Sequence, residues 1–196
     1  YYLSRLIDID SSYLGSADDD IEALRFSPGG QLLAAVGRDA RIRLFQWPTG
    51  KAMKEIESGQ GRVNDLAYFP DGQRLVTAGH DGTLRFWDVQ PGTLQRTIEA
   101  HVGPVRDVVF AVREEWIISC GLDKRIRIWN PDLGSCEREL EGHERGVEAL
   151  AVSPDGRLLA SAGNDGTLRI WDLKGRRAPQ SFKHDNGRVV CVAWSR

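Results

Sequence analysis

The chain has 196 residues, of which 41% are hydrophobic and 28% charged, an ordinary composition for a folded globular protein. Its formal net charge is -2, from 26 basic and 28 acidic residues that are interspersed along the sequence, so a nucleic-acid partner is not expected. No apolar stretch reaches the roughly 18 residues of a membrane helix. No membrane partner is therefore expected, and three cysteines without CxxC spacing favour a reducing, cytoplasmic location.

Four units of similar design follow one another along the chain. We expect them at 21–57, 63–99, 105–141 and 147–184. Each unit contains four short apolar or β-branched runs separated by turn sequences such as Asp-Gly, which predicts four antiparallel strands per unit. Some inner runs are apolar on both faces, so each sheet must be covered on both sides. Radial packing of like sheets, as in the blades of a β-propeller, meets that requirement.

Shorter segments flank these units. Residues 2–15 are predicted to be outer strands of an earlier blade, and residues 189–196 the innermost strand of a following one. The whole chain, 1–196, is thus predicted to be one all-β propeller segment with four full blades and a partial blade at each end. Blades from the parent chain, a second copy in a homo-oligomer, or another protein must cover the open ends. We favour the parent chain, since the sequence begins without Met.

Residues of the same type recur every 42 positions. A Gly-X-Asp turn is followed by an aromatic residue six positions after the Asp. The Asp residues are Asp39, Asp81, Asp123 and Asp165, and the aromatic residues are Phe45, Trp87, Trp129 and Trp171. A single enzyme site does not explain a pattern that occurs four times, whereas a repeat architecture does.

The amino-acid sequence of the repeat resembles that of the WD-repeat β-propeller family. The string Gly-His-Asp-Gly-Thr-Leu-Arg-Phe-Trp-Asp begins at Gly79, a near-identical string begins at Gly163, and Gly142 with His143 resembles the Gly-His element of that family. The resemblance covers the chain from about residue 15 onward. It implies a non-enzymatic protein–protein interaction scaffold, the recognition or regulatory part of a larger protein, whose partner is a protein or peptide.

The same resemblance implies a hydrogen-bonded tetrad that fastens each blade. An indole N–H only donates and a carboxylate only accepts, whereas a hydroxyl and a neutral imidazole each donate and accept. Four such side chains can therefore form a chain in which every hydrogen-bonding group has a partner. The predicted structural tetrads are His101, Ser119, Asp123 and Trp129, and, 42 residues later, His143, Ser161, Asp165 and Trp171.

The first two units depart from the tetrad. The second retains a partial tetrad of Thr77, Asp81 and Trp87. Gly59 replaces the His there, so the network is incomplete or closed by water or by Gln60. In the first unit, Ala17, Ala35 and Phe45 surround Asp39, and no comparable network is expected.

His, Ser and Asp are also the residue types of a nucleophilic triad. The triad would have to occur twice with an added Trp, and neither Ser lies in a Gly-X-Ser-X-Gly elbow. We therefore expect no catalytic residue, no metal ligand and no cofactor. An enzyme with its catalyst in channel-facing loops, or a phosphate- or nucleic-acid-binding propeller, is the alternative.

Specificity is expected where the repeat breaks, on the face near the central channel. By the resemblance, the residues flanking the first-strand Val and the residue before each turn Asp line this face. The candidates for partner binding are Glu22, Arg38, Arg62, Asn64, His80, Arg106, Leu122, Glu148 and Asn164. Three of them are Arg residues from successive units and would form a basic arc able to hold acidic or phosphorylated peptides. The alternative is that they are solvated loop residues. A separate basic run, residues 174–177, is too short to predict a nucleic-acid surface.

Overall fold

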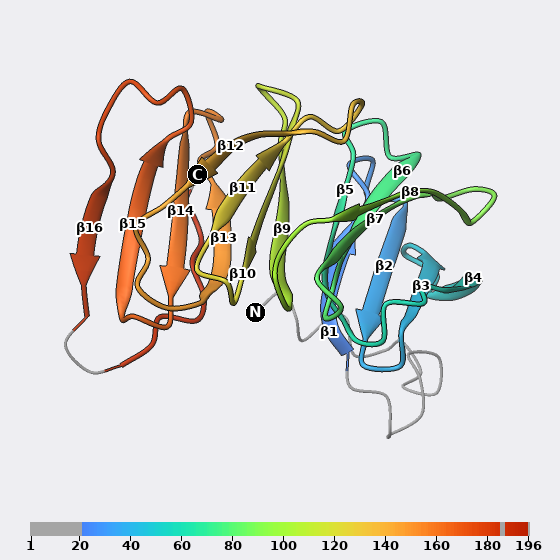
Figure 1. Cartoon of the computed structure of the whole chain (residues 1–196). Helices are drawn as coiled ribbons and strands as arrows, with labels where there is room; N and C mark the ends of the chain where they lie inside the picture. The colour runs from blue at the N-terminus through green and yellow to red at the C-terminus, as the bar shows by residue number, and fades with distance from the viewer. Residues whose placement is uncertain (1–20, 185–186, 196) are drawn as a thin grey trace.

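The computed structural model describes residues 21–184 and 187–195, and in these ranges all regular structure is β-strand (Figure 1). The first sheet contains β1 (Ile21–Phe26), β2 (Leu32–Gly37), β3 (Arg41–Gln46) and β4 (Lys51–Glu57). The second contains β5 (Val63–Tyr68), β6 (Arg74–Gly79), β7 (Thr83–Asp88) and β8 (Thr93–Glu99). The third contains β9 (Val105–Ala111), β10 (Trp116–Gly121), β11 (Ile126–Trp129) and β12 (Cys136–Leu140). The fourth contains β13 (Val147–Val152), β14 (Leu158–Gly163), β15 (Thr167–Asp172) and β16 (Gln180–Lys183).

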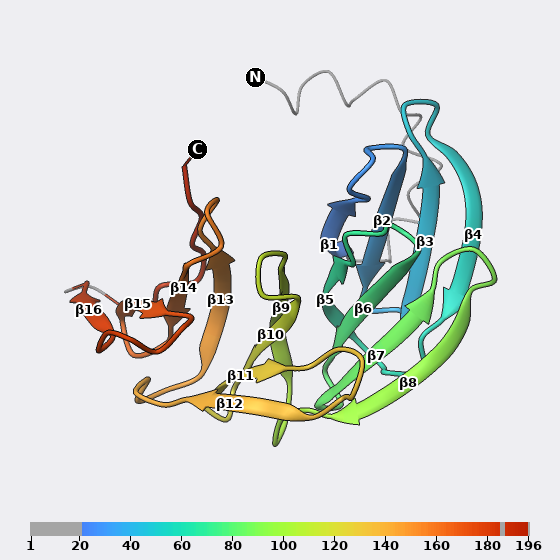
Figure 2. The same cartoon turned by 90° about the horizontal axis from the view of Figure 1, so that it is seen from above.

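Each sheet is a four-stranded antiparallel meander in which neighbours in sequence are neighbours in space. The predicted all-β class of four-stranded antiparallel blades is thereby confirmed. Figure 2 shows the blades arranged side by side along an arc, with β1, β5, β9 and β13 at the inner rim and β4, β8, β12 and β16 outside. The blades do not close into a ring, because the first and fourth lie at opposite ends of the arc.

The hydrophobic core is divided into layers between successive blades. One cluster joins the first and second blades, for example Leu44 with Leu66, a second joins the second and third, and a third joins the third and fourth. The apolar inner strands predicted from sequence lie where both faces are covered: β5 is buried along its whole length. Burial on both faces explains why these strands lack the alternation of a half-exposed sheet.

The structure bears on only one of the two predicted partial blades. Residues 2–15 lie outside the described residues. Within 187–195 no strand is assigned. This segment follows the fourth blade, where Val189 donates a backbone hydrogen bond to Gly163 O (3.1 Å) and Trp194 Nε1 donates to Ala151 O (2.9 Å). A strand is defined by a ladder of backbone hydrogen bonds to a neighbouring strand, and among the described residues this segment pairs with no strand in that way.

The turns that contain the repeated Asp share a left-handed residue in all four blades. The residue after the Asp has positive φ: 63° at Ala40, 90° at Gly82, 71° at Lys124 and 75° at Gly166. A Cβ at Gly82 would lie 2.6 Å from His101 O. Glycine therefore suits this position in two blades, whereas the other two accept a non-glycine residue at some cost in backbone strain.

Candidate interaction surface and the networks behind it

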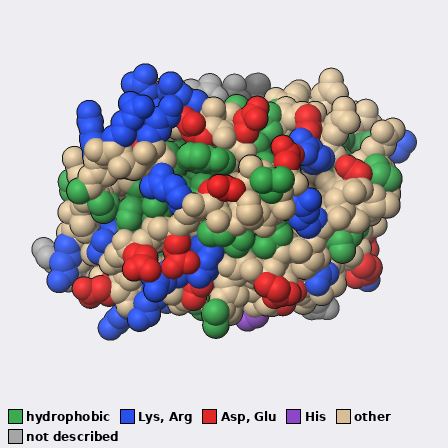
Figure 3. Space-filling model, turned by 45° about the horizontal axis from the view of Figure 1, so that its top comes forward, with side chains coloured by type: hydrophobic (Ala, Val, Ile, Leu, Met, Phe, Trp, Pro, Cys, Tyr) green, Lys and Arg blue, Asp and Glu red, His purple; other side chains and the backbone are tan. Residues whose placement is uncertain are grey.

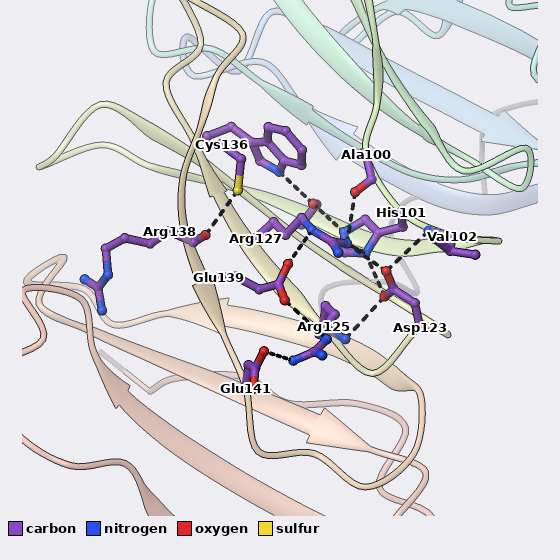
Figure 4. A network of polar contacts seen from close by, with 12 residues as sticks. Ala100, His101, Val102, Asp123, Arg125, Arg127, Cys136, Arg138, Glu139 and Glu141 are labelled. Carbon is purple, nitrogen blue, oxygen red and sulfur yellow. Dashed lines mark hydrogen bonds and ion pairs between the residues drawn. The ribbon is translucent and has the colours of Figure 1, made fainter.

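In the third blade, the four predicted tetrad side chains form one hydrogen-bonded chain, part of which appears in Figure 4. Trp129 Nε1 lies 2.9 Å from Ser119 Oγ, which lies 2.8 Å from His101 Nε2. The other imidazole nitrogen, Nδ1, lies 2.8 Å from Asp123 Oδ1. Because the indole only donates and the carboxylate only accepts, the Ser119 hydroxyl donates to Nε2 and Nδ1–H donates to Asp123. A neutral imidazole thus satisfies every link.

Arg127 adds a cation to this network (Figure 4). Its Nη1 lies 2.7 Å from Asp123 Oδ2 and donates to Ala100 O at 3.0 Å. The same atom lies 2.8 Å from His101 Nδ1, but Nδ1 already carries the proton donated to Asp123, so this approach is not a hydrogen bond. Hydrogen bonds from His101 and Arg127 outweigh the effect of burial and hold the pKa of Asp123 well below its usual value.

This Arg was not singled out in the sequence, although the signal for it was present. An Arg follows each turn Asp by four residues, and these residues, Arg43, Arg85, Arg127 and Arg169, keep the 42-residue step. In the second blade, Arg85 donates to Ser58 O and lies 3.5 Å from Asp81 Oδ2. In the second and third blades the repeated Arg therefore belongs to the blade fastener.

The fourth blade repeats the chain of the third. Trp171 Nε1 lies 2.8 Å from Ser161 Oγ, which lies 2.7 Å from His143 Nε2. His143 Nδ1 lies 2.9 Å from Asp165 Oδ2. Burial lowers the pKa of His143 more than Asp165 raises it, which favours the neutral imidazole that the chain of donors requires.

Asp165 accepts more hydrogen bonds than its link to His143. The Thr167 hydroxyl lies 2.7 Å from Oδ1, the Thr167 backbone N–H donates to Oδ1 at 2.9 Å, and the Glu144 backbone N–H donates to Oδ2 at 2.8 Å. Burial opposes ionisation, but these bonds prevail and lower the pKa of Asp165 to about 2. The carboxylate thus joins the β14–β15 turn to Glu144, in the segment that precedes β13.

In the second blade, Gln60 closes the network that lacks a His. Trp87 Nε1 donates to Thr77 Oγ1 at 3.0 Å, and Thr77 Oγ1 donates to Gln60 Oε1. Gln60 Nε2 lies 3.0 Å from Thr83 Oγ1, which donates to Asp81 Oδ1 at 2.8 Å. Of the two closures left open by the sequence, water or Gln60, the structure shows Gln60.

Gly59 has a local reason to lack a side chain. Its φ is 67°, and a Cβ there would lie 2.7 Å from Arg85 Nη1. The backbone turns so that the next residue, Gln60, points into the position that His occupies in the later blades.

The first blade has no such chain among its described residues. Asp39 forms an ion pair with Arg43 and accepts the backbone N–H of Arg41 at 3.3 Å. Ala35 and Phe45 belong to a small apolar cluster instead. Ala17 lies outside the described residues.

Six of the nine candidates for partner binding fall into two polar clusters. At the first and second blades, Glu22 Oε1 lies 3.0 Å from Arg38 Nε and 2.9 Å from Arg62 Nη2. At the third and fourth, Glu148 Oε2 lies 2.6 Å from Arg106 Nε, and Glu148 also accepts from the amide of Asn164. The three Arg residues of the predicted basic arc are therefore paired with glutamates, which reduces the positive charge that this face presents.

The other candidates differ in accessibility. His80 is exposed, and so is Leu122, at 42%. Asn64 is buried, and its amide Nδ2 donates to Val105 O at 2.5 Å, so it joins the second blade to the third. Asn64 therefore reads as a structural residue, whereas the first two are available to a partner.

In the second, third and fourth blades, a repeated backbone bond holds the residue before the turn Asp. The N–H of His80 donates to Arg62 O at 2.8 Å, that of Leu122 to Pro104 O at 3.2 Å, and that of Asn164 to Gly146 O at 2.8 Å. Equivalent positions thus have the same backbone anchor and different side chains.

Two buried carboxyl groups on the inner strands also join the blades. Asp65 Oδ2 accepts the backbone N–H of Val108 at 3.3 Å, and Asp107 Oδ2 accepts that of Leu150 at 2.7 Å. Arg25 Nη2 lies 2.7 Å from the other oxygen of Asp65. Burial, reinforced by nearby Asp107, raises the pKa of Asp65 well above its usual value. Both carboxyls bind backbone of the next blade, a role in packing.

Within 21–184 and 187–195, no group of three or more His, Cys, Asp or Glu side chains is placed to hold a metal ion. No helix in the described part of the chain is long and apolar enough to cross a membrane.

The fold and the repeated networks define a WD-repeat propeller, and comparison with protein families agrees. The WD domain, G-beta repeat family matches residues 9–46, 50–88, 92–130 and 134–172. The chain therefore belongs to the WD-repeat family. No curated protein matches the chain. Members of this family are typically non-enzymatic scaffolds that mediate protein–protein interactions.

Proposed function

We propose that this chain is the recognition part of a larger protein and binds a protein or peptide segment at the face that carries His80, Leu122 and Asn164. The observation that supports this proposal most directly is the repeated backbone hydrogen bond that fixes each of these residues before its turn. A rigid frame that presents different side chains at equivalent positions suits recognition, because little conformational entropy is lost when a partner binds.

The ion pairs of this face refine the nature of the partner. Glu22 with Arg38 and Arg62 leaves an excess of one positive charge, whereas Arg106 and Glu148 balance each other. A purely acidic segment would therefore meet carboxylates as well as guanidinium groups. A mixed polar segment with an apolar side chain that reaches Leu122 fits this surface better.

Affinity capture with the 196-residue chain tests this proposal. We expect the double variant His80→Ala/Leu122→Asp to lose a partner that the wild type retains, with an unchanged melting temperature because both side chains are exposed. The matched control is Gln90→Ala/Leu133→Asp, which changes exposed residues in the β7–β8 and β11–β12 connections. Equal capture by the wild type and both variants would overturn the assignment of this face.

We further propose that more blades cover the two ends of the arc, supplied by the parent chain or by a second copy. At one end Phe26 is 46% exposed, and at the other Phe182 is 53% and Val190 is 60% exposed. Large apolar side chains at both ends of a sheet stack favour association with like sheets. A cytoplasmic location also stays a proposal, supported by three unpaired cysteines.

A further inference from the structure

A basic pocket lies on the face opposite to the turn residues described above. The β13–β14 turn and the β15–β16 loop line it together with the β9–β10 turn of the preceding blade. In an antiparallel meander these connections lie at the other end of the strands from the β14–β15 turn that carries Asn164. The pocket is therefore separate from the proposed recognition face. Its volume is about 450 Å³.

The pocket carries a marked excess of positive charge. Its basic lining residues are Arg113, Arg157, Lys174, Arg176 and Arg177, and its acidic ones are Asp155 and Asp172. Figure 3 shows basic side chains gathered at the upper left of the molecule, over the last blade. Five basic against two acidic lining side chains leave three positive charges in excess, and two when the adjacent Glu114 is counted, in a chain whose net charge is -2.

The two acidic side chains are occupied by the turns that they close. Asp155 Oδ1 lies 2.6 Å from Ser153 Oγ and accepts the backbone N–H of Arg157 at 3.1 Å. Asp172 Oδ1 accepts the backbone N–H of Lys174 at 2.9 Å. The hydrogen bonds from Ser153 and Arg157 also lower the pKa of Asp155. Both carboxylates are held in place by their turns and count as negative charges in the balance given above.

The cations themselves are weakly paired. Within the described part of the chain, Arg176 and Arg177 have no ion-pair partner. Glu114 Oε1 lies 3.4 Å from Lys174 Nζ and 3.7 Å from Arg113 Nε, and Arg157 Nε lies 3.7 Å from Asp155 Oδ2. Pairs of this length at or near the surface contribute little to stability. A ligand that offers bidentate anionic oxygens can replace them at small cost.

We propose that this pocket binds a phosphorylated segment of a protein partner. Arg guanidinium groups form paired hydrogen bonds with phosphate oxygens, and four Arg residues from two blades line this pocket. A nucleic acid would need a basic surface continuous over many phosphates, whereas the excess charge is confined to one end of the arc. This site goes beyond the proposed recognition face, because it involves other residues at the opposite end of the strands.

Fluorescence anisotropy of the 196-residue chain tests the site. The probe is a labelled twelve-residue Gly-Ser peptide with two phosphoserines, compared with its unphosphorylated form. We expect the triple variant Arg113→Ala/Arg176→Ala/Arg177→Ala to bind the phosphorylated probe at least about tenfold more weakly, because a hydrogen bond to a charged group contributes about tenfold or more. Replacing Arg176 and Arg177 by Lys keeps the charge and loses the paired geometry, so a smaller loss is expected.

The control removes three Arg residues outside the pocket, with the variant Arg41→Ala/Arg125→Ala/Arg145→Ala. It changes the net charge equally and is expected to bind the probe within about twofold of the wild type, apart from the long-range term that added salt screens. Melting temperatures verify that all variants fold. Equal binding by the pocket and control variants, equal binding of both peptide forms, or no binding would overturn the proposal. Tighter binding of a twelve-nucleotide single-stranded RNA would overturn it in favour of nucleic acid.

Discussion

At the residue scale, two different sets of side chains complete the same hydrogen-bonded chain. The third and fourth blades place a His between a hydroxyl and a carboxylate, as at His143. The second blade uses the amide of Gln60 and the hydroxyl of Thr83 for the same purpose. What the site requires is an ordered succession of donors and acceptors, because a buried polar group without a partner costs about 1–3 kcal/mol.

The two closures differ in their response to pH. Burial places the native pKa of His143 below the value in the unfolded chain, so the unfolded state binds the proton first as pH falls below about 6.5. The contribution of neutral His143 is complete above that pH and is lost as pH falls toward the native pKa. An amide does not titrate. Asp165, with a pKa of about 2, stays ionised in this window.

We therefore expect His143→Ala to cost less stability at pH 5 than at pH 7. Gln60→Ala is the matched control and is expected to cost about 1–3 kcal/mol at both pH values. Chemical denaturation at the two pH values measures both changes. If His143→Ala costs as much at pH 5 as at pH 7, the neutral imidazole is not the form that stabilises the blade.

At the scale of elements, the sequence repeat and the sheet are out of phase by one strand. The family match at 50–88 begins beside β4, the outer strand of the first blade, and ends with β7, the third strand of the second. The same offset holds for the matches at 92–130 and 134–172. Each sequence repeat therefore spans two sheets and connects them covalently as well as through packing.

Burial of equivalent residues shows what a neighbouring blade provides. Leu24 and Leu66 occupy the same place in β1 and β5, 42 residues apart, yet Leu24 is 44% exposed and Leu66 is fully buried. The side chain, strand and register are alike. Only the preceding blade, against which Leu66 packs, makes the difference.

We expect Leu66→Ala to destabilise the chain by about 2–5 kcal/mol, as a fully buried Leu does. Leu24→Ala is expected to cost less than about 1 kcal/mol, since little apolar area leaves the interior. Denaturant unfolding of the two variants decides between this expectation and its alternative. Equal losses would mean that the face of β1 is covered as well as that of β5.

At the scale of the whole molecule, the arc exposes one apolar face at each end. These faces correspond to the two sides of the interface that recurs between blades. The first blade of one copy could therefore pack against the fourth blade of another. Heterologous contacts of this kind either close a ring or continue to grow. Further blades in a parent chain would cover the same faces.

We expect light scattering to show concentration-dependent association of the 196-residue chain. The double variant Leu24→Lys/Phe182→Lys is expected to shift the distribution toward the monomer, because it places charges on both end faces. Val112→Lys/Leu133→Lys changes exposed apolar residues outside these faces and serves as the control. A monomer at every concentration would contradict this expectation.

The prediction of blades succeeded because turn chemistry and strand length are local. Asp-Gly turns and runs of four to seven residues mark each strand, and the 42-residue step marks each tetrad. The neutralising partners of the predicted basic arc were not foreseen. Glu22 pairs with Arg62 from the next blade. Arg106 and Glu148 are 42 residues apart in sequence and come into contact only when the third and fourth blades pack together.

The sequence by itself determined the repeat, the four-stranded blades and the residue types of the fasteners, because strand and turn signals depend on neighbours in the chain. Tertiary structure alone decided which side chain closes the second network, how the Arg residues are paired, and that Arg113 joins a basic run some 60 residues away. These features depend on the packing of one blade against the next, and burial and charge pairing follow from that packing.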